Sequence, residues 1–359
     1  MKETFKKFLG KQLAKWAKRV IDRNHPSIIG ITGTIAKTST KEAVYDVLLE
    51  KFGNDIKRSP GNLNNELGVP LAILGFDHTP SYFEWPWVFI KAWRRSRTLI
   101  LPRYLILEMA ADKPGDISYL VKIAPPKYGI VTTIGPAHLV HFKTIDAVAK
   151  EKAILIKSLP KDGVAFLNAN DKLVRLMSKL TMAKVILFES AREHIAEVIA
   201  KTVGKYFDVP DDKMNLILKN FQGLPGRWQI FENQGGGIII DDCYNANPLS
   251  METALNQMSK LAKETKISRK VAILGDMLEL GNYEDQAHKL IMNKARKLAD
   301  LIIGVGPAMK KVKPDFWFPC AHEAGEWLLK EIKEGDMIFI KGSHGIHLEE
   351  IVKMIKKVG

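Results

Sequence analysis

Short apolar runs alternate with stretches of helical periodicity from residue 28 onward, and this alternation is the strongest constraint on the fold. Such runs are typical of buried strands in a mostly parallel sheet, with helices packed on both faces. A Gly/Pro cluster, QGLPGR, interrupts the series and indicates a domain boundary. We therefore predict two α/β domains, at 28–222 and 223–359. The predicted strands are 28–31, 104–107, 128–132, 164–167 and 185–188 in the first domain, and 237–240, 271–274, 301–304 and 337–340 in the second.

The composition is that of a folded protein without a disulfide framework. The chain has 359 residues, 46% of them hydrophobic and 26% charged, which is enough for two or three domains with their own cores. Cys243 and Cys320 are the only cysteines, and their spacing indicates no thiolate metal site, which favours a reducing cytoplasm. No stretch approaches the roughly 18 apolar residues of a membrane span, and no apolar signal-peptide core is visible.

The net charge of +14, from 54 basic and 40 acidic residues, favours a polyanionic partner. Nucleotides, acidic lipid surfaces and nucleic acids all fit this charge. The basic residues are dispersed along the chain and no recognised nucleic-acid module is visible, so we expect no nucleic-acid partner.

Residues 1–23 predict a basic amphipathic helix, which we treat as a separate segment, 1–27. A second segment, 82–97, again combines aromatic residues with a basic end. Each segment is expected either to dock on the body of the protein or to contact a membrane surface. The expected location is therefore the cytoplasm, with peripheral contact at the inner face of the membrane through residues 1–23 as the alternative.

The stretch Ile31–Glu42, ITGTIAKTSTKE, places a glycine turn, a lysine and three hydroxyl residues between an apolar run and a helical pattern at 40–52. Backbone N–H groups at such a helix start can face an anion. Lys37 would meet phosphate oxygens, and a following hydroxyl would meet magnesium. The Walker pattern is imperfect, because Ile31 and Ala36 replace glycines, and an ordinary strand-to-helix turn is the alternative. The residues assigned to this nucleotide loop are Gly33, Thr34, Ala36, Lys37, Thr38 and Ser39.

Polar residues after other apolar runs are further candidates, because ligands bind at the carboxyl ends of strands in open α/β sheets. Glu108 follows YLIL and could hold magnesium, while His138 lies in a Gly/Pro turn suited to a metal or a phosphate. Asp242 and Asn245 lie in a turn that could meet a ribose, and Lys152 lies on a helical pattern. Each has a structural alternative: a lone carboxylate or histidine, a solvated lysine, or a helix cap.

The order of several short segments is more specific than any one of them. In this order they resemble the Mur ligases, the ATP-dependent amide-bond ligases of peptidoglycan synthesis, and most closely the MurF branch, which adds D-alanyl-D-alanine to a UDP-muramoyl-tripeptide. The resemblance implies a P-loop-type ATPase domain with a mostly parallel sheet, followed by a smaller Rossmann-like α/β domain. The segments are ITGTIAKTSTKE, GNLNNELGVP, EMAADKPGDISYL, TTIGPAHLVHF, VAKEKAIL, LPGR, IDDCYNANPLSM, ILGDMLELG and IKGSHGIHLE.

The resemblance also implies a reaction that uses ATP and Mg²⁺. A substrate carboxylate attacks the γ-phosphate of ATP, and an incoming amine converts the resulting acyl phosphate to an amide. Lys37 matches the lysine that binds the β- and γ-phosphates. Thr38 and Glu108 match the ligands of a first magnesium ion, and His138 matches a ligand of the second. Lys152 matches a lysine that CO2 converts to a carbamate within the magnesium site.

Other positions match residues that contact nucleotide or substrate in this family. Arg227 matches an arginine that contacts phosphate, and Asp242, with Asn245 in the same turn, matches the ribose contact. A loop containing Asn64, Asn65 and Glu66 would face the acyl substrate. The resemblance places Asp276, Lys341, Ser343 and His344 where the C-terminal domain receives the incoming amino acid or dipeptide.

Several features depart from the family pattern. Residues 1–27 stand in place of a complete UDP-binding domain. We expect either that a partner protein recognises the UDP-sugar, that the acyl substrate differs, or that the helix brings the enzyme to a lipid-linked precursor. Ala36 adds a Cβ near phosphate, at a cost of roughly 1 kcal/mol if the backbone needs positive φ. The region 171–194 is short, the segment HIAEVIAKTVG lacks the asparagines that meet adenine, and His344 replaces an arginine.

The leading hypothesis is a MurF-like peptide ligase of cell-wall synthesis. A second hypothesis keeps the ligase chemistry and changes the acyl or amine substrate. A third is a Mur-like protein that binds nucleotide without turnover. The joint presence of the phosphate and metal positions argues against the third, because sequence drift has no reason to spare them all.

Overall fold

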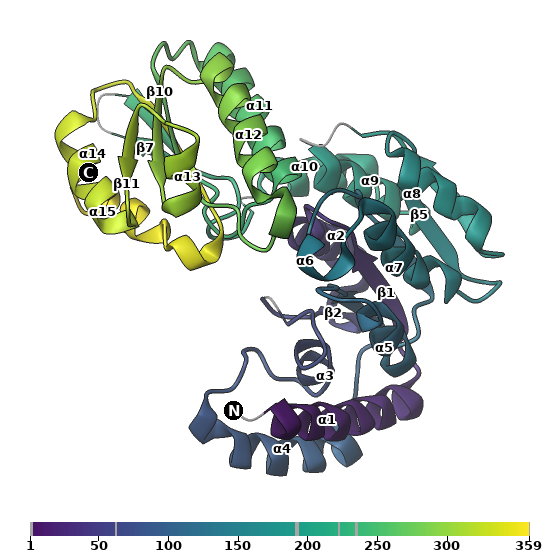
Figure 1. Ribbon diagram of the computed structural model, residues 1–359. Helices are drawn as coiled ribbons and strands as arrows, with labels where there is room; N and C mark the ends of the chain where they lie inside the picture. The colour runs from purple at the N-terminus through teal and green to yellow at the C-terminus, as the bar shows by residue number, and fades with distance from the viewer. Residues whose placement is uncertain (1–2, 62, 191–193, 222, 234–235, 359) are drawn as a thin grey trace. The chain divides into compact units, whose positions relative to one another are not determined.

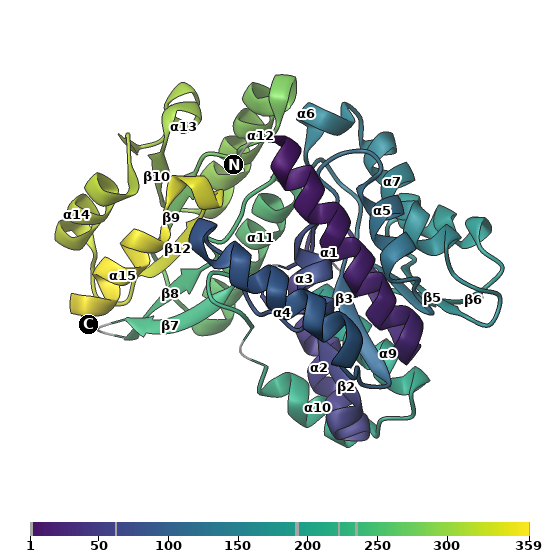
Figure 2. The same cartoon turned by 90° about the horizontal axis from the view of Figure 1, so that it is seen from below.

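The structure, a computed structural model, describes residues 3–61, 63–190, 194–221, 223–233 and 236–358. The chain forms two compact units, which appear in Figures 1 and 2 as two separate sheets with their helices. The first unit comprises Met1–Gly135 and Thr144–Phe221, and the second comprises Pro136–Lys143 and Gln222–Gly359. None of the helices described by the structure is both long and apolar enough to cross a membrane.

A six-stranded sheet in the order β2-β3-β1-β4-β5-β6 forms the centre of the first unit, and every neighbouring pair is parallel. The predicted mostly parallel sheet is thereby confirmed. The sequence did not predict β2, a three-residue edge strand with one buried side chain. The strands are β1 Ser27–Thr32, β2 Ile56–Arg58, β3 Tyr104–Glu108, β4 Tyr128–Val131, β5 Val164–Asn168 and β6 Lys184–Phe188.

Helices cover both faces of this sheet. Apolar residues of α2, α9 and α10 pack on one face, and those of α7 and α8 pack on the other. On α9, for example, Ile195, Ile199 and Val203 recur every four residues and are buried as one stripe. The helices are α1 Glu3–Asn24, α2 Lys37–Phe52, α3 Gly68–Ile73, α4 Trp85–Thr98, α5 Asp116–Ile123, α7 Ile145–Lys157, α8 Lys172–Leu176, α9 Ile195–Tyr206 and α10 Asp211–Lys219, with 3₁₀ helices η1 Gly53–Asp55, η2 Tyr82–Glu84 and η3 Met177–Leu180.

The N-terminal helix α1 packs on the first unit, against α3, α4 and α5 (Figures 1 and 2). Leu13, Ala17 and Val20 on its apolar face are fully buried, whereas Phe8 is 53% exposed. Polar contacts also hold the helix, because Tyr119 Oη donates to Gly10 O at 3.2 Å and Asn24 Nδ2, at its last residue, donates to Leu99 O at 3.2 Å. The apolar face of α1 is thus used inside the protein.

The second unit has its own six-stranded sheet, in the order β11-β10-β9-β12-β8-β7, which is parallel except for the antiparallel edge strand β7. Helices α11 and α12 pack on one face, and α14 and α15 pack on the other. The strands are β7 Gln229–Asn233, β8 Gly237–Asp241, β9 Lys270–Gly275, β10 Leu301–Val305, β11 Phe316–Phe318 and β12 Met337–Lys341. The helices are α6 Leu139–Phe142, α11 Pro248–Thr265, α12 Glu284–Leu298, α13 Pro307–Lys311, α14 Ala321–Glu331 and α15 Glu349–Val358, with η6 Gly281–Tyr283 and η7 His344–Ile346.

Candidate active site

The loop between β1 and α2 is the predicted nucleotide loop, and it adopts a backbone that favours glycine. Gly33 has φ +145°, and a Cβ built there would lie 1.9 Å from Thr132 Oγ1. Ala36, with φ 59°, is the residue that precedes α2 and lies in the left-handed region. The helix begins at Lys37, three residues earlier than the pattern at 40–52 predicted. Position 36 does need a positive φ, so the expected cost of roughly 1 kcal/mol for alanine instead of glycine applies here.

Hydrogen bonds tie this loop to the loop after β4. Thr34 N donates to Thr133 O at 2.8 Å, and Gly135 N donates to Thr34 Oγ1 at 3.0 Å. Thr132 Oγ1 donates to Ile35 O at 2.7 Å. Strands β1 and β4 are neighbours whose connections leave in opposite directions along the sheet, which is the place where ligands bind in open α/β sheets.

Five buried oxygen atoms in or near this loop have no hydrogen-bond partner among the described residues, namely Thr32 Oγ1, Thr38 Oγ1, Thr40 Oγ1, Thr133 Oγ1 and Glu108 Oε2. Of these, Thr38 Oγ1, in the first turn of α2, and Glu108 Oε2, at the end of β3, belong to the predicted magnesium ligands. The other carboxylate oxygen, Glu108 Oε1, accepts from Asn64 Nδ2 at 2.8 Å. Hydroxyl and carboxylate oxygens are the ligands that Mg²⁺ prefers, so these residues fit the predicted magnesium site. Within the described part of the chain, no cluster of three or more His, Cys, Asp and Glu side chains could hold a metal alone. A magnesium ion here would therefore need phosphate oxygens or water as further ligands.

Lys152 is buried on α7, at 3% exposure. Burial, together with the nearby charge of Lys37, lowers its pKa to about 7. Asp112, Glu151 and Glu108 oppose this shift. Lys152 therefore lies close enough to Lys37 and Glu108 to interact electrostatically with both. A large fraction of this amine is neutral near pH 7, which is the state that can act as a nucleophile.

Lys37 itself is half-buried at the start of α2, where Nζ donates to Thr34 O at 3.2 Å. Ser39 follows in the same turn and is half-buried as well. The first unit thus brings together the predicted phosphate lysine, the two predicted magnesium ligands and the predicted carbamate lysine.

The loop expected to face the acyl substrate precedes α3. Asn64 contacts Glu108 as described, and its carbonyl oxygen accepts from Ala110 N at 2.8 Å. Asn65 Oδ1 accepts from Leu67 N at 3.2 Å and Gly68 N at 2.9 Å, so it caps the start of α3. Glu66 is half-buried. Burial of Tyr119, together with the negative charge of Glu66, raises the pKa of Tyr119 to about 12. Their contact with an acyl substrate stays a prediction.

Several residues that hold this site had no signal in the sequence. Lys41 is fully buried, and its Nζ donates to Ser59 O at 2.7 Å and Gly61 O at 2.9 Å, which fixes the loop before Asn64. Asp171 Oδ2 accepts from Ile134 N at 2.7 Å, in the loop after β4. Both contacts join positions that are far apart in the chain, which local patterns cannot pair.

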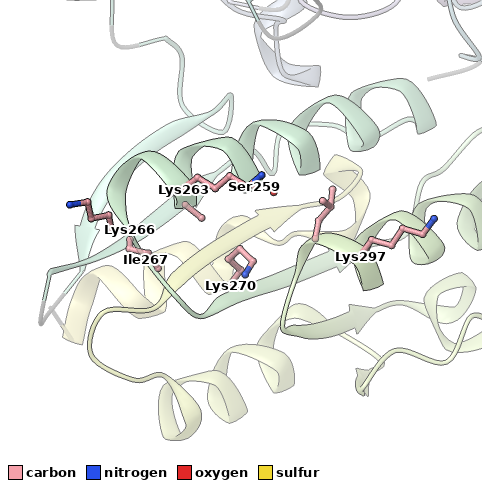
Figure 3. Close-up of a pocket in the computed structure, with 8 residues that line it drawn as sticks. Ser259, Lys263, Lys266, Ile267, Lys270 and Lys297 are labelled. Atoms are coloured by element: carbon pink, nitrogen blue, oxygen red, sulfur yellow. The ribbon is translucent and has the colours of Figure 1, made fainter.

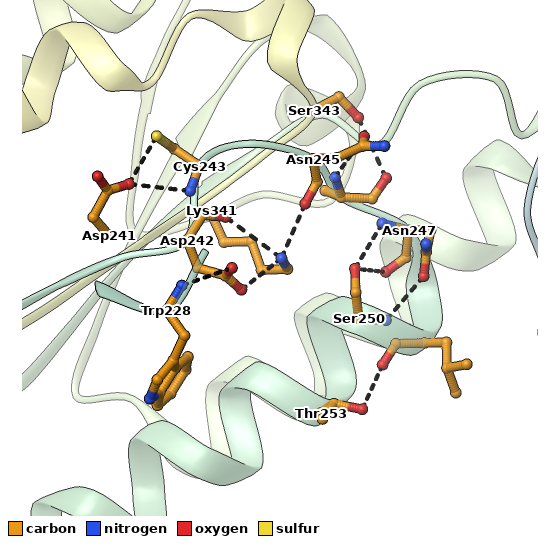
Figure 4. A network of polar contacts seen from close by, with 12 residues as sticks. Trp228, Asp241, Asp242, Cys243, Asn245, Asn247, Ser250, Thr253, Lys341 and Ser343 are labelled. Atoms are coloured by element: carbon orange, nitrogen blue, oxygen red, sulfur yellow. Dashed lines mark hydrogen bonds and ion pairs between the residues drawn. The ribbon is translucent and has the colours of Figure 1, made fainter. Parts of the chain in front are cut away.

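A polar network occupies the carboxyl end of β8 and β12 in the second unit (Figure 4). Lys341 Nζ lies 2.6 Å from Asp242 Oδ2 and 2.9 Å from Asn245 O, and Trp228 N donates to Asp242 Oδ1 at 3.2 Å. Burial raises the pKa of Asp242, while the charges of Lys341 and Arg227 oppose the rise. Lys341 therefore orients the predicted ribose contact and its turn.

Two other predicted substrate residues organise backbone in this unit. Asp276 is buried, and its carboxylate accepts from Ala308 N at 3.0 Å and Met309 N at 2.8 Å at the start of α13. Ser343 Oγ accepts from Leu278 N at 3.0 Å. Neither side chain is exposed.

A row of cationic and aromatic groups, half-buried at Arg227 and Tyr244 and exposed at His344, lies beside this network. The Arg227 guanidinium carbon is 4.0 Å from the centre of the Tyr244 ring, and Tyr244 stacks on His344 with ring centres 6.0 Å apart. The turn before Arg227 is held in place, because Tyr244 N donates to Gly226 O at 3.0 Å. Arg227 and His344 can therefore both meet an anionic ligand of the second unit.

His138 precedes the short helix α6 with a positive φ of 51°. Its Nδ1 lies 2.7 Å from Glu279 Oε2, and both residues belong to the second unit. A carboxylate on Nδ1 fixes the orientation of the ring. The predicted metal contact of His138 stays a prediction.

A pocket of about 470 Å³ opens in the second unit between the ends of α11 and α12 and the start of β9 (Figure 3). Lysines 263, 266, 270 and 297 line it, but Figure 3 shows their ammonium groups pointing in different directions. Lys270 is also paired with Asp300 at 2.5 Å. None of the predicted site residues lines this pocket.

Two models of known protein families match this chain. A model described as "Mur ligase middle domain" matches residues 98–230, and one described as "Mur ligase, glutamate ligase domain" matches residues 226–344. The chain belongs to the Mur ligase family. Together the two matches run from residue 98 to residue 344. They cover the first unit from residue 98 onward and most of the second unit.

Curated relatives of this Mur ligase share one name, UDP-N-acetylmuramoyl-tripeptide--D-alanyl-D-alanine ligase. The Mycobacterium leprae protein is 29% identical over 96% of this chain and 76% of its own length. The Escherichia coli protein is 25% identical over 97% of this chain and 80% of its own length. The Bacillus subtilis protein is 25% identical over 95% of this chain and 78% of its own length.

Solved structures confirm the predicted fold of this Mur ligase. The MurF ligase of Thermotoga maritima in complex with ADP superposes with a TM-score of 0.81 at 23% identity, covering 97% of this chain and 83% of that chain. Acinetobacter baumannii MurF gives a TM-score of 0.80 at 22% identity, with 97% and 80% covered. E. coli FolC in complex with ADP gives 0.68 at 16% identity, with 97% and 94% covered.

Proposed function

We propose that this Mur ligase is an ATP-dependent peptide ligase that joins D-alanyl-D-alanine to a UDP-muramoyl-tripeptide through an acyl phosphate. The observation that carries the proposal is the gathering of Lys37, the unpartnered oxygens of Thr38 and Glu108, and buried Lys152 in one unit. These groups supply the cations and oxygen ligands that phosphoryl transfer needs. The shared name of the curated relatives supports the choice of substrates.

Lys37 neutralises phosphate charge while the substrate carboxylate attacks the γ-phosphorus of ATP. The bond from that phosphorus to the ADP oxygen breaks as the acyl phosphate forms. The amine of the dipeptide then attacks the acyl carbon, loses a proton, and expels inorganic phosphate to leave the amide. Backbone N–H groups at the start of α2 add positive potential beside the same phosphates.

Thr38 and Glu108 would hold a magnesium ion, with His138 as ligand of a second. Such an ion, when bound, neutralises the developing charge on the phosphoryl group. Asn64 keeps the Glu108 carboxylate in position, so that Oε2 rather than Oε1 is open to the ion. Loss of the Asn64 side chain would therefore free the Glu108 carboxylate to move.

We further propose that Lys152 is carbamylated. Its neutral amine adds to CO2, a nitrogen–carbon bond forms, and one proton is released to solvent. Burial and the Lys37 charge favour this step, because they disfavour the ammonium form that cannot react. The product carries a negative charge beside Lys37 and near the magnesium ligands, where a cation would stabilise it.

The second unit would contribute nucleotide and amine contacts. Arg227 would meet phosphate, and Asp242, oriented by Lys341, would meet the ribose with Asn245 in the same turn. We assign residues 28–222 to the ATP-binding domain and 223–359 to the C-terminal ligase domain. The enzyme would act in the cytoplasm.

The test measures phosphate release by the full chain from ATP and Mg²⁺ with UDP-muramoyl-tripeptide and D-alanyl-D-alanine. Lys152→Ala should lower the rate at least about a hundredfold. Lys150→Ala, on the exposed side of the same helix, is the matched control and should leave it unchanged. Folded protein that releases no phosphate with any muramoyl peptide would be incompatible with this function.

A different amine substrate is the second candidate. His344, exposed and stacked on Tyr244, offers an imidazole ring at the predicted carboxylate contact, where the family has an arginine. A panel of amino acids and dipeptides, assayed with the same acyl substrate, separates the two candidates. Faster turnover with an amine other than D-alanyl-D-alanine would favour the second.

A further inference from the structure

Helix α4 presents apolar side chains on two opposite faces. Trp85, Val88 and Ala92 point inward and are buried. The outward face carries Trp87 at 68% exposure, Ile90 and Trp93, and the exposed apolar surface continues at both ends of the helix. Phe83, 86% exposed, lies before α4, and Ile100, 81% exposed, lies after it. Scattered exposed apolar residues are ordinary, but a run along one helix marks an interaction surface.

Basic side chains alternate with these apolar ones. Lys91, Arg94 and Arg97 are exposed on the same side of α4, and the Arg97 guanidinium carbon lies 4.0 Å from the centre of the Trp93 ring. Glu84 is the only acidic residue between 79 and 103. Its carboxylate is already engaged, since it accepts from Ser81 N at 2.6 Å and lies 3.2 Å from His78 Nε2. The face is therefore apolar and strongly cationic at once.

The solvent side of α1 extends this charge. Lys11, Lys15, Lys18 and Arg19 are exposed, while Leu13, Ala17 and Val20 are buried. The two helices contact each other, with the rings of Trp16 and Phe89 5.2 Å apart, and Figure 2 shows them crossing on one face of the first unit. We call the exposed parts of α1, η2 and α4, together with Ile100, the α1–α4 face.

We propose that the α1–α4 face binds the surface of an anionic lipid bilayer. Protein interfaces bury a core that is depleted of charged residues. Here the exposed apolar residues stand directly beside lysines and arginines, which suits a headgroup region where indoles insert and long cationic chains reach phosphates. The helix that inserts is α4, because most apolar side chains of α1, including Leu13, Ala17 and Val20, are buried against the protein. In this arrangement α1 supplies charge to the membrane contact rather than an anchor.

The test is co-sedimentation of the full chain with vesicles of equal parts phosphatidylglycerol and phosphatidylcholine, compared with phosphatidylcholine alone. The unaltered protein should partition onto the anionic vesicles at least about tenfold more strongly. The double variant Trp87→Glu, Ile90→Glu should lose at least about tenfold of that binding, and so should Arg94→Glu, Arg97→Glu. Raised salt should weaken binding, since it screens the cationic part of the contact.

Leu176→Glu and Leu216→Glu are matched controls, because both leucines are exposed on helices of the same unit outside the α1–α4 face. They should bind vesicles as the unaltered protein does. Circular dichroism and turnover with soluble substrates check that the α4 variants are folded. The proposal is overturned if the unaltered protein stays in solution with anionic vesicles, or if the controls lose binding equally. A dimer that Trp87→Glu dissociates would overturn it too, by assigning the face to a protein partner.

Discussion

Lys152 connects the chemistry of the site to the pH dependence of stability. Its pKa in the folded protein is about 7, against 10.5 for an ordinary lysine. Between these values the unfolded chain binds a proton that the folded chain does not, so the free energy of unfolding should rise with pH. The gain should be at most about 1.4 kcal/mol per pH unit. Below about pH 7 both forms are protonated and this pH dependence disappears.

Urea unfolding in CO2-free buffer from pH 7 to 9.5 measures this rise. Lys152→Met keeps the volume of the side chain and removes the titration, so its stability should change less with pH across that range. Identical pH profiles for the two proteins would mean that Lys152 keeps its proton in the folded state.

Thr38 and Thr40 form a natural pair for separating metal binding from folding. Both hydroxyls are buried on α2 without a hydrogen-bond partner among the described residues. Valine at either position removes a buried unsatisfied hydroxyl, so each variant should gain roughly 1 kcal/mol of stability. Only Thr38→Val should raise the magnesium concentration needed for half-maximal turnover. Denaturant titration and magnesium-dependent phosphate release measure the two effects. Equal losses of activity in both variants would exclude Thr38 as a specific ligand.

Substitutions at Ala36 and Gly33 should change the ATP affinity of this loop in opposite directions. Ala36→Gly removes a Cβ from a residue at φ 59°, so ATP should bind more tightly, while stability changes by less than about 1 kcal/mol. Gly33→Ala introduces a Cβ 1.9 Å from Thr132 Oγ1 and should weaken both nucleotide binding and stability. Calorimetric titration with a non-hydrolysable ATP analogue measures the affinities. Unchanged affinity in Ala36→Gly would show that the methyl group does not hinder phosphate.

At the scale of elements, Lys41 on α2 should control the loop that leads to Asn64. Lys41→Met leaves the carbonyls of Ser59 and Gly61 without their buried donor, which should cost roughly 3 kcal/mol. Hydrogen exchange in residues 59–68 should quicken as that loop loosens. Lys57→Met, at an exposed position of the neighbouring strand β2, is the control and should change stability by less than about 0.5 kcal/mol. Unaltered exchange in Lys41→Met would mean that the loop is held by other contacts.

The sequence predicted the central strands because their apolar runs are mostly buried, and it also predicted the edge strand β6, whose run of apolar residues is continuous although partly exposed. The edge strands β2, β7 and β11 were not predicted. Ile56–Arg58 shows why, since it is short and only Ile56 is fully buried. A strand with one solvent-facing edge needs no continuous apolar run, so its pattern resembles a loop. The start of α2 was missed by three residues because Ala36 gives no side-chain cap to signal it.

Site residues were predictable where a motif is local and were missed where contacts are distant. Lys37 and Thr38 lie in one short loop, and Glu108 ends an apolar run. By contrast, the anchoring of Ile134 N by Asp171, 37 residues away, depends on the three-dimensional fold. The burial of Lys152 follows from the packing of α7 rather than from its neighbours in the chain.

At the scale of the whole molecule, the two units have separate apolar cores, so heat should unfold them in two transitions. Phe166 in the first unit and Phe339 in the second are both fully buried and offer matched variants. Either alanine variant should cost about 3–5 kcal/mol, confined to the transition of its own unit. MgATP should raise the transition that Phe166→Ala lowers, because Lys37 and Thr38 lie in the first unit, and Lys37→Ala should abolish that rise. Differential scanning calorimetry measures all of these shifts. A single transition that both phenylalanine variants lower equally would show instead that the two cores unfold as one cooperative structure.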